Sequence, residues 1–366
     1  MKFSLSREAL LNPLQFVAGV VERRQTLPIL SNILFSLDGN KLSLTGTDLE
    51  VEIRGTTEVL ATIEAGQATV PARKILDICR ALPEGASLDF AVEDGKASVT
   101  SGKSRFSLAT LPANEFPTAD EGTQDVEFVA SASMIKGLIE STSFAMAQQD
   151  VRYYLNGMLW EVTNNRLRVV ATDGHRLALC DGVCQVSIED KLSAILPRKG
   201  IVELSRLLVD EEVRVSMGAN HVRITGSNYR FTSKLVDGAY PDYDRVLPKE
   251  GDKKVTGDRE SLKHAFGRTA ILSNEKYRGV RIQLQPGAMH MFATNPEQEE
   301  AQEEVAVSYK GDSLEIGFNV SYLLDVLTVL KGQKILFTLS DSNSSALIEE
   351  DSDDNKALYV VMPMRL

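Results

Sequence analysis

The hydrophobic and polar positions of this chain follow the same order of elements three times. Each round opens with apolar residues spaced three and four apart, a pattern typical of a helix that buries one face. Two alternating runs around a polar turn come next and predict a β-hairpin, and a second helix and further strands follow. The apolar faces of the opening helices are Leu10, Leu14, Val17 and Val21 in the first round, Ile135, Leu138, Ile139 and Met146 in the second, and Leu262, Phe266 and Ala270 in the third.

Turn and cap residues place the other elements of each round. The predicted hairpins turn at residues 38–40, 164–165 and 286–287. The second helices are predicted to begin at Pro71, Pro197 and Asn319. Proline suits the first turn of a helix because its missing amide would have had no partner there, and asparagine can cap that turn. With closing strands at 97–100, 222–225 and 358–361, each round reads as an α+β module of two helices on antiparallel sheet.

A short phrase marks the repeat itself. LSLTGTD at 42–48 recurs as LRVVATD at 167–173 and more faintly as MHMFATN at 289–295, with spacings of 125 and 122 residues. A repeat of that length is a whole domain. Linker-like stretches at 117–122 and 248–252 then predict domains over residues 1–122, 123–250 and 251–366. Three similar domains in line suggest a symmetric scaffold more than an enzyme.

Composition narrows the class of protein. The 366 residues are 43% hydrophobic, which is enough for three cores. No run approaches the roughly 20 apolar residues of a membrane helix, and the N-terminus does not resemble a secretory signal. The three cysteines, an odd number, suggest reduced thiols, with Cys79 on the apolar face of a helix. We therefore expect a soluble, cytoplasmic protein.

The charge of the chain is unevenly distributed. The net charge of −11, taken alone, argues against binding to nucleic acid. The six predicted helices (6–24, 71–82, 131–147, 197–209, 258–272 and 319–334) together carry +7, so the rest of the chain carries −18. Helices that face inward, with sheets outside, could attract a polyanion that the chain encircles. The alternative is that these lysines and arginines are ordinary solvated helix surface.

The sequence offers no convincing catalytic, cofactor or metal site. Gly102, Lys103 and Ser104 invite a phosphate-loop interpretation, but Ala97 stands where that motif needs glycine, and the residues that follow predict a strand. The four histidines have no paired ligand spacing with each other or with cysteine. We therefore expect a protein without catalytic activity or cofactor.

Three longer phrases carry a resemblance to a known family. ATDGHRL at 171–177, YPDY at 240–243 and YVVMPMRL at 359–366 are similar to the bacterial β sliding clamps of DNA polymerase III, and the match covers essentially the whole chain in the right order. The resemblance implies a head-to-tail homodimer that forms a closed ring of six clamp domains, with helices lining a hole around duplex DNA. A heterologous contact that closes after two copies gives such a ring.

The resemblance also implies residues that contact DNA. These are Arg24, Arg73, Gln149, Tyr153 and Tyr154, with Arg198 and Lys199 as weaker candidates by charge and position. A protruding tyrosine could stack on an exposed base. The alternative is that Tyr153 and Tyr154 simply begin a strand.

A second implied site is an apolar cleft between the second and third domains, into which polymerases, the clamp loader and repair proteins insert short linear peptides. Thioether side chains suit such a site because they repack around different partners. Alternatively, Val360 and Met362 are ordinary core on a terminal strand. The matching positions are Leu155, Thr172, Gly174, His175, Arg176, Leu177, Pro241, Arg245, Val246, Val360, Met362, Pro363, Met364 and Arg365.

Two other stretches bear on the cleft. Residues 344–347 border it in the family, but the sequence does not fix their register. Asn295 and Pro296 replace the Asp-Gly-His-Arg continuation in the third repeat, which should therefore lack a cleft of this kind.

The ring would close where edge strands pair across two subunits. Opposite charges and a small apolar patch make the contact self-consistent, although the acidic run could also be a solvated loop. The predicted contact joins Lys74, Lys103, Arg105 and Phe106 of the first domain to Ile271, Leu272, Glu297, Glu299, Glu300, Glu303 and Glu304 of the third.

Three functional hypotheses follow. The leading hypothesis is a DNA sliding clamp that confers processivity on a replicative polymerase and has no catalysis of its own. The second is a three-domain interaction scaffold that uses the same cleft but does not encircle DNA. An enzyme that acts on phosphates is a distant third.

Overall fold

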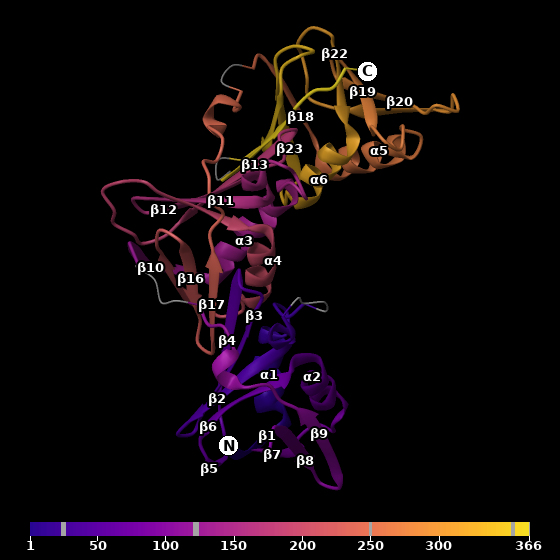
Figure 1. The fold of residues 1–366 in the computed structure, drawn as a ribbon. Helices are drawn as coiled ribbons and strands as arrows, with labels where there is room; N and C mark the ends of the chain where they lie inside the picture. The colour runs from indigo at the N-terminus through magenta and orange to yellow at the C-terminus, as the bar shows by residue number, and fades with distance from the viewer. Residues whose placement is uncertain (23–26, 120–123, 249–250, 353–355, 366) are drawn as a thin grey trace. The chain divides into compact units, whose positions relative to one another are not determined.

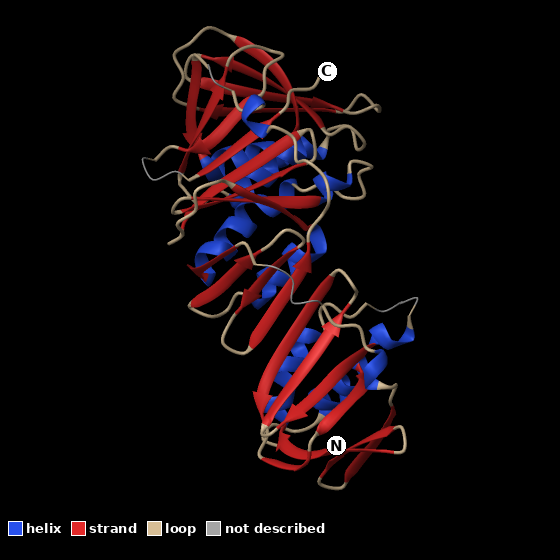
Figure 2. Ribbon diagram, turned by 60° about the vertical axis from the view of Figure 1, so that its left-hand side comes forward, coloured by secondary structure: helices blue, strands red, loops and turns tan. Residues whose placement is uncertain are grey.

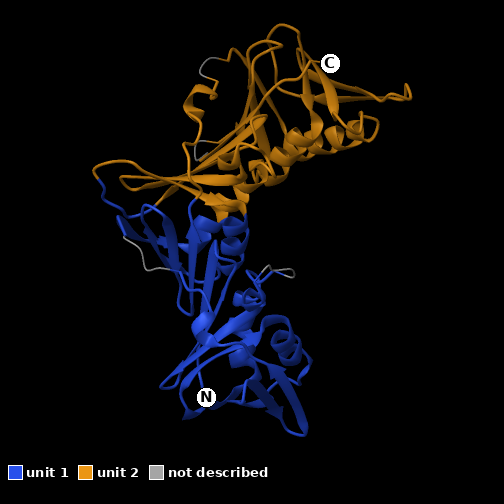
Figure 3. Cartoon of the chain, in the orientation of Figure 1, with its two compact units in different colours: residues 1–136, 184–188, 199–235 blue, residues 137–183, 189–198, 236–366 orange. Residues whose placement is uncertain are grey.

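The structure is a computed structural model that describes residues 1–22, 27–119, 124–248, 251–352 and 356–365. The chain divides into two compact units (Figure 3). Unit 1 comprises residues 1–136, 184–188 and 199–235, and unit 2 comprises residues 137–183, 189–198 and 236–366.

The described residues form six α-helices, in agreement with the predicted number. Ser6, Asp258 and Asn319 cap three of them, each accepting a hydrogen bond from a backbone N–H of the first turn. The helices are α1 (Arg7–Val17), α2 (Ala72–Ala81), α3 (Ala132–Thr142), α4 (Arg198–Leu207), α5 (Arg259–Ile271) and α6 (Val320–Val329).

Unit 1 contains two antiparallel sheets, with α1 packed on β3 and β4 (Figures 1 and 2). The smaller sheet has the order β5 (Ala61–Glu64), β1 (Lys2–Ser6), β7 (Ser87–Glu93), β8 (Lys96–Ser101) and β9 (Ser104–Ala109). The larger has the order β10 (Val126–Ser131), β15 (Glu212–Met217), β16 (His221–Thr225), β17 (Tyr229–Lys234), β4 (Val51–Glu58), β3 (Lys41–Thr47), β2 (Asn32–Asp38) and β6 (Gly66–Pro71).

Unit 2 also contains two antiparallel sheets, with α5 packed on β20, β21 and α6. The larger has the order β14 (Leu192–Pro197), β11 (Gly157–Thr163), β12 (Arg166–Thr172), β13 (Arg176–Val183), β25 (Ala357–Val361), β24 (Ala346–Glu350), β23 (Lys334–Leu339) and β18 (Lys253–Asp258). The smaller has the order β21 (Glu300–Ala306), β20 (Ala288–Thr294), β19 (Gly279–Gln285) and β22 (Leu314–Asn319).

All three predicted hairpins are confirmed. Asp38 pairs with Lys41 across the first turn, and the corresponding pairs close the second turn between β11 and β12 and the third between β19 and β20. Gly39, Asn165 and Gly287 have φ values of +54°, +57° and +83°, the left-handed region that glycine and asparagine tolerate best.

The predicted helix ends are partly wrong. The first helix was expected to reach residue 24, but α1 ends at Val17, and Val21 is not helical. Gly19, a poor helix former, follows at a point where a Cβ would lie 2.1 Å from Glu203 Oε2. Similarly, α3 ends at Thr142, before Met146, and α6 ends at Val329, before residue 334.

The second helices of the first two repeats begin one residue later than predicted. Pro71 and Pro197 are the last residues of β6 and β14, and the helices begin at the next residue. Pro71 and Pro197 form the last pairs of their ladders, with Asn32 and Gly157. Proline is tolerated at such a strand end because no further ladder pair follows it.

The sheets join successive repeats. Strand β4 of the first repeat pairs with β17 of the second, and β13 of the second pairs with β25 of the third. We call the β4–β17 pairing the first seam and the β13–β25 pairing the second seam. Because the two compact units cut through the second repeat, they do not test the predicted bounds of three domains.

Candidate functional site

The repeated Thr-Asp phrase forms a tight turn beside the second seam. Thr172 Oγ1 donates to the Arg176 carbonyl at 2.6 Å and accepts from the Gly174 N–H at 3.1 Å. Asp173 Oδ1 accepts from the backbone N–H groups of His175 and Arg176 at 2.9 and 3.1 Å. Gly174 has a φ of +87°, so the turn needs a residue that tolerates the left-handed region.

Arg176 ties this turn to its surroundings. Its guanidinium donates to Asp173 at 3.2 Å and to the Phe144 carbonyl at 2.9 Å, and it also donates to Asp325 on α6. It lies over the rings of Phe144 and Tyr322, at 5.1 and 4.5 Å from their centroids. With so many of its donors engaged, Arg176 serves to position the turn, and its guanidinium is poorly placed to hold a ligand.

An apolar cluster lies next to the turn. Its buried members come from strands β11, β12, β13, β14 and β25 and from the segment after residue 240, so distant parts of unit 2 build one floor. They are Leu159, Val170, Leu177, Leu179, Ile195, Tyr243 and Val360. Partly buried residues packed against them are Tyr154, Val236, Tyr240, Val246, Leu247, Leu347 and Leu358.

A buried polar contact anchors one wall of this cluster. The Tyr243 hydroxyl donates to Glu161, a carboxylate that is 5% exposed and also pairs with Lys191 at 2.6 Å. Burial, and secondarily the bond to Glu161, raises the pKa of Tyr243 to about 12. The segment that carries Tyr243 is thereby held against the sheet.

The C-terminal segment forms the exposed rim. The Met362 N–H donates to the His175 carbonyl at 2.9 Å, and the Met364 N–H donates to the Gly317 carbonyl at 2.9 Å. Met362 is 37% exposed, and the His175 ring stacks on Tyr322 with centroids 6.2 Å apart. Arg245, in the 3₁₀ turn that carries Tyr243, is exposed and pairs with Asp242 at 2.8 Å. The result is an apolar floor edged by a thioether, an imidazole and a guanidinium.

All fourteen predicted cleft residues belong to unit 2, but they differ in depth. Leu155, Thr172, Leu177 and Val360 are buried, so they can support a ligand only from below. The exposed members are His175, Pro241, Arg245, Met362 and Arg365, and those of intermediate exposure are Gly174, Arg176, Val246, Pro363 and Met364.

The sequence interpretation missed part of the floor. Val170, Leu179 and Ile195 lie on three different strands, β12, β13 and β14, and only strand pairing brings them together. The open question of residues 344–347 is now answered in part, because Leu347 pairs with Val360 and packs against the cluster.

The predicted DNA-binding residues have varied surroundings. Arg24 lies outside the described residues. Arg73 is exposed in the first turn of α2. Tyr153 is 58% exposed, whereas Tyr154 packs against the apolar cluster, and the two form a short 3₁₀ turn that precedes β11.

The loop around Gln149 has a defined conformation. Gln149 is exposed with a φ of +56°, an uncommon value for a residue other than glycine. Asp150 and Asn156 exchange two hydrogen bonds of 2.9 Å through their backbone and side-chain groups. Hydrogen bonds from Arg152 lower the pKa of Asp150 to about 2. The loop therefore presents Gln149 and Tyr153 on an ordered backbone.

The two weaker cationic candidates already have partners. Lys199 pairs with Glu22 at 2.5 Å and with the buried carboxylate of Asp48. Arg198 donates to the Met146 carbonyl at 3.3 Å. Their charges are therefore partly committed to the protein itself.

The predicted dimer residues lie on or near two edge strands, β9 and β21. Arg105 and Phe106 belong to β9, and Lys103 lies in the turn before it, while Lys74 is exposed on α2. Ile271 is 74% exposed and ends α5, and Leu272 follows it. The acidic residues of this set are Glu297, Glu299, Glu300, Glu303 and Glu304, of which Glu303 pairs with Arg268 at 2.6 Å.

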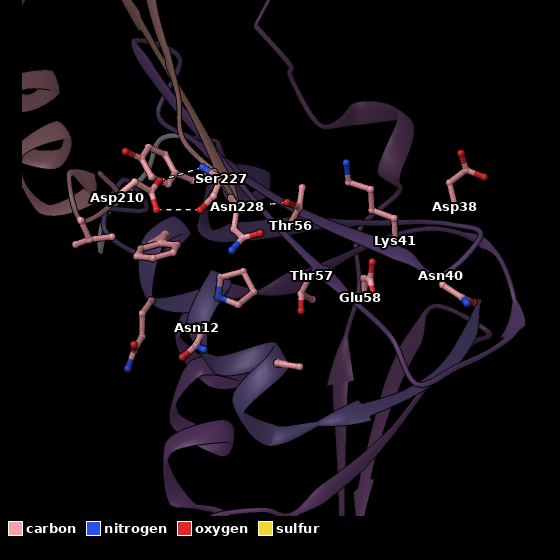
Figure 4. A pocket seen from close by; sticks show the side chains of 16 residues that line it. Asn12, Asp38, Asn40, Lys41, Thr56, Thr57, Glu58, Asp210, Ser227 and Asn228 are labelled. Atoms are coloured by element: carbon pink, nitrogen blue, oxygen red, sulfur yellow. Dashed lines mark hydrogen bonds between the residues drawn. The ribbon is translucent and has the colours of Figure 1, made fainter. Parts of the chain in front are cut away.

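A separate pocket of about 750 Å³ lies in unit 1. Figure 4 shows Asp210, Ser227 and Asn228 at one end and Asp38 and Asn40 at the other. The backbone N–H and hydroxyl of Ser227 both donate to Asp210 at 2.9 Å, so the polar groups at that end are paired with each other. None of the predicted site residues that the structure describes lines this pocket.

Within the described ranges, no group of three or more histidine, cysteine, aspartate or glutamate side chains could hold a metal ion. No helix in those parts of the chain has the length and apolar character needed to cross a bilayer.

Comparison with known proteins identifies the family. Three family models of the DNA polymerase III beta subunit match this chain. The model of the N-terminal domain matches residues 1–120, that of the central domain residues 130–242 and that of the C-terminal domain residues 244–365. The beta sliding clamps of Pseudomonas putida and Escherichia coli K12 are 60% and 52% identical, with all of each chain covered. A Pseudomonas aeruginosa sliding clamp solved with bound griselimycin is 59% identical over the full length of both chains, with a TM-score of 0.97. The chain therefore belongs to the DNA polymerase III beta subunit family, the DNA sliding clamps, and is built from three clamp domains.

Proposed function

We propose that two copies of this chain close into a ring of six domains around duplex DNA and tether a replicative polymerase through the cleft at the second seam. Each copy would supply clamp domains over residues 1–122, 123–250 and 251–366. The ring would remain on DNA by topology while each phosphate contact stays weak and exchangeable, which allows it to slide.

The observation that carries the partner-binding half is the apolar floor at the second seam with Met362 exposed on its rim. An apolar pocket edged by a few polar groups is the usual form of a peptide or ligand site. Griselimycin binding by the Pseudomonas aeruginosa relative supports a ligand site on clamps of this kind. We assign the cleft to short linear peptides of the polymerase, the clamp loader and repair proteins.

The DNA-binding half of the proposal uses Arg24, Arg73, Gln149, Tyr153 and Tyr154. The ordered loop at Gln149 and the exposed ring of Tyr153 support a contact with bases or backbone. The edge strands β9 and β21 support a subunit contact, because an unpaired strand edge is a template for pairing with another chain.

The proposed ring has no chemistry of its own. It would act inside the cell, in the cytoplasm, as a processivity subunit and would need no cofactor. The full-length likeness to sliding clamps favours this function over a scaffold that never encircles DNA.

Retention on DNA tests the proposal. The protein is loaded by a clamp loader onto nicked circular DNA, and half of the sample is then linearised with a restriction enzyme. We expect the protein to remain on the circles and to be lost from the linear molecules, because only a free end releases a ring. Loss at equal rates from both would contradict encirclement.

A variant of the cleft rim separates the partner-binding part of the proposal from the encirclement of DNA. Met362→Ala should weaken binding of the polymerase and should reduce the amount of protein loaded, because the clamp loader uses the same cleft. Rings that have been loaded should remain on circles as long as those of the unaltered protein. If Met362→Ala left polymerase binding unchanged while a surface variant such as Lys276→Ala weakened it, the cleft assignment would be wrong.

A further inference from the structure

A second hollow in unit 2 begins where the proposed cleft ends. It has a volume of about 930 Å³ and is lined in part by Met364 and Arg365, which are also predicted cleft residues. The Met364 N–H bonds to the Gly317 carbonyl on the edge strand β22, so the C-terminal segment leads from the cleft rim to this hollow. Figure 1 shows the segment that follows β25 running beside β22.

The wall of the hollow is the face of the small sheet that points away from its core. Ile282, Met291 and Ile316 are buried on one side of strands β19, β20 and β22. Arg281 and Phe292, their neighbours in the chain, therefore point to the other side, because successive side chains of a strand alternate. Both residues line the hollow.

Neighbouring residues fix the orientation of the Arg281 side chain but leave its N–H donors available for a ligand. Its guanidinium lies 4.9 Å from the centroid of the Phe292 ring, and Glu315 lies 3.7 Å from its Nη1. Among the described residues, no side-chain hydrogen bond uses its N–H groups, and its side chain is 49% exposed. Gly317 pairs with Arg281 across the strands, so no side chain covers the guanidinium from that position.

This geometry suits a carboxylate. A guanidinium presents donors in a planar fork that matches the two oxygens of a carboxylate, and stacking on an aromatic ring fixes its plane in advance. Among the described residues that line the hollow, the exposed Arg365 adds a second positive charge, and Glu315 is the one carboxylate. The hollow therefore favours an anionic group that arrives along the C-terminal segment.

We propose that a partner peptide held in the cleft continues past Met364 and places an aspartate or glutamate carboxylate on Arg281. This inference rests on the proposed peptide cleft and adds a chemical requirement to it. Partners with an acidic residue beyond one end of the segment that occupies the cleft would bind more tightly than partners without one.

The test uses synthetic peptides and the full-length chain. The probe is the shortest fragment of the organism's replicative DNA polymerase that binds the chain, amidated at its C-terminus. It is extended at either end by two aspartates or, as an isosteric control, by two asparagines. For one of the two ends, we expect the aspartate peptide to bind about fivefold more tightly than the asparagine peptide at low salt.

Variants assign that preference to one residue. Arg281→Gln should remove the preference for aspartate, whereas Lys276→Gln, which deletes an equal charge nearby but outside the hollow, should retain it. Phe292→Leu keeps the charge and removes the ring, so it should reduce the preference in part. A free C-terminal carboxylate on the unextended fragment distinguishes a chain terminus from a side chain as the source of the anion.

Several outcomes would overturn the inference. Equal binding of the aspartate and asparagine peptides at both ends would exclude a carboxylate site. An equal loss of preference in Arg281→Gln and Lys276→Gln would indicate general attraction only. Failure of the proposed function looks different, because the unextended fragment would then bind equally well to Met362→Ala and to the unaltered protein.

Discussion

The two seams share one backbone plan and differ in what they place beside it. At the first seam, Thr47 Oγ1 donates to the Val51 carbonyl at 2.9 Å, as Thr172 Oγ1 does to Arg176 at the second. Asp48 Oδ1 accepts two backbone N–H groups at 3.0 and 2.7 Å, as Asp173 does. The repeated Thr-Asp phrase is therefore a turn motif that introduces the strand at each seam.

The floors beside these turns differ in polarity at three of four corresponding positions. Leu159, Val170, Leu177 and Leu179 of the second repeat correspond, 125 residues earlier, to Leu34, Thr45, Glu52 and Arg54. The residues paired with these positions across the strands also differ, being apolar in the second seam and polar in the first. Leu159 faces Ile195 where Leu34 faces Thr69, and Leu177 faces Val360 where Glu52 faces Thr232.

The polar groups in the floor of the first seam have hydrogen-bond partners within the chain. Glu52 Oε2 accepts the Ala119 N–H at 2.7 Å, and Asn32 donates to Thr69 at 3.0 Å. Thr69 also exchanges hydrogen bonds of 2.8 and 2.9 Å with the backbone of Leu111. Because these groups already have partners, an apolar ligand would gain little there and would disrupt them. The repeated sequence therefore determines the backbone architecture of both seams, whereas a few side chains determine which seam can bind a peptide.

The largest effect is expected from giving the second seam the residue of the first. Leu177→Glu would bury a carboxylate at a position that is 3% exposed and lies among the apolar residues of the cluster. We expect the free energy of unfolding to fall by roughly 3–4 kcal/mol, measured by urea denaturation. Leu177→Met is the control, with a loss below about 1.5 kcal/mol. Equal losses would mean that shape, and not charge, distinguishes the seams.

Removing the rim should affect binding more than folding. Deletion of residues 362–366 leaves β25 intact, since that strand ends at Val361, but removes the hydrogen bond of Met362 to His175. We expect the affinity for the polymerase fragment to fall about a hundredfold, which corresponds to about 2.7 kcal/mol. The dimer, measured by analytical ultracentrifugation, should persist. Unchanged fragment binding would contradict the cleft assignment.

The first seam should resist conversion into a cleft. Glu52→Leu leaves the Ala119 N–H without its acceptor, so we expect the free energy of unfolding to fall by about 1–3 kcal/mol. Isothermal titration should still give one fragment per chain, because Thr45, Thr69 and Thr232 keep the floor polar. Two fragments per chain would show that a single carboxylate separates the seams.

Sequence reasoning succeeded where the information is local. The three hairpins and the existence of six helices follow from turn residues and apolar spacing, which act within a few positions of the chain. Helix ends were less predictable, because α1 stops just before Gly19, where a Cβ would clash with the side chain of Glu203, 184 residues away. The three-domain family was recognisable because its phrases are long and ordered.

The candidate site was predictable only in outline. The resemblance supplied its residues, but the depth of each depends on strand pairing, as the buried Val360 and the exposed Met362 illustrate two positions apart. Tyr243 and Glu161 are 82 residues apart, and no local pattern indicates that the hydroxyl meets the carboxylate. The same holds for Arg281 and Phe292, which meet because of the register between β19 and β20.

The smallest effects are expected at the left-handed position of each turn, where the seams differ by one residue. Leu49 occupies it in the first seam with a φ of +80°, and Gly174 occupies it in the second with a φ of +87°. Gly174→Ala should lower the free energy of unfolding by about 1–2 kcal/mol, because alanine is strained there and its Cβ would lie 3.1 Å from the Arg152 guanidinium. Leu49→Gly relieves the same strain but gives the unfolded chain more freedom, so its effect should be below about 1 kcal/mol. Paired urea denaturation curves measure both changes. If the two variants lost equal stability, the left-handed backbone would not be what makes the turns of the two seams equivalent.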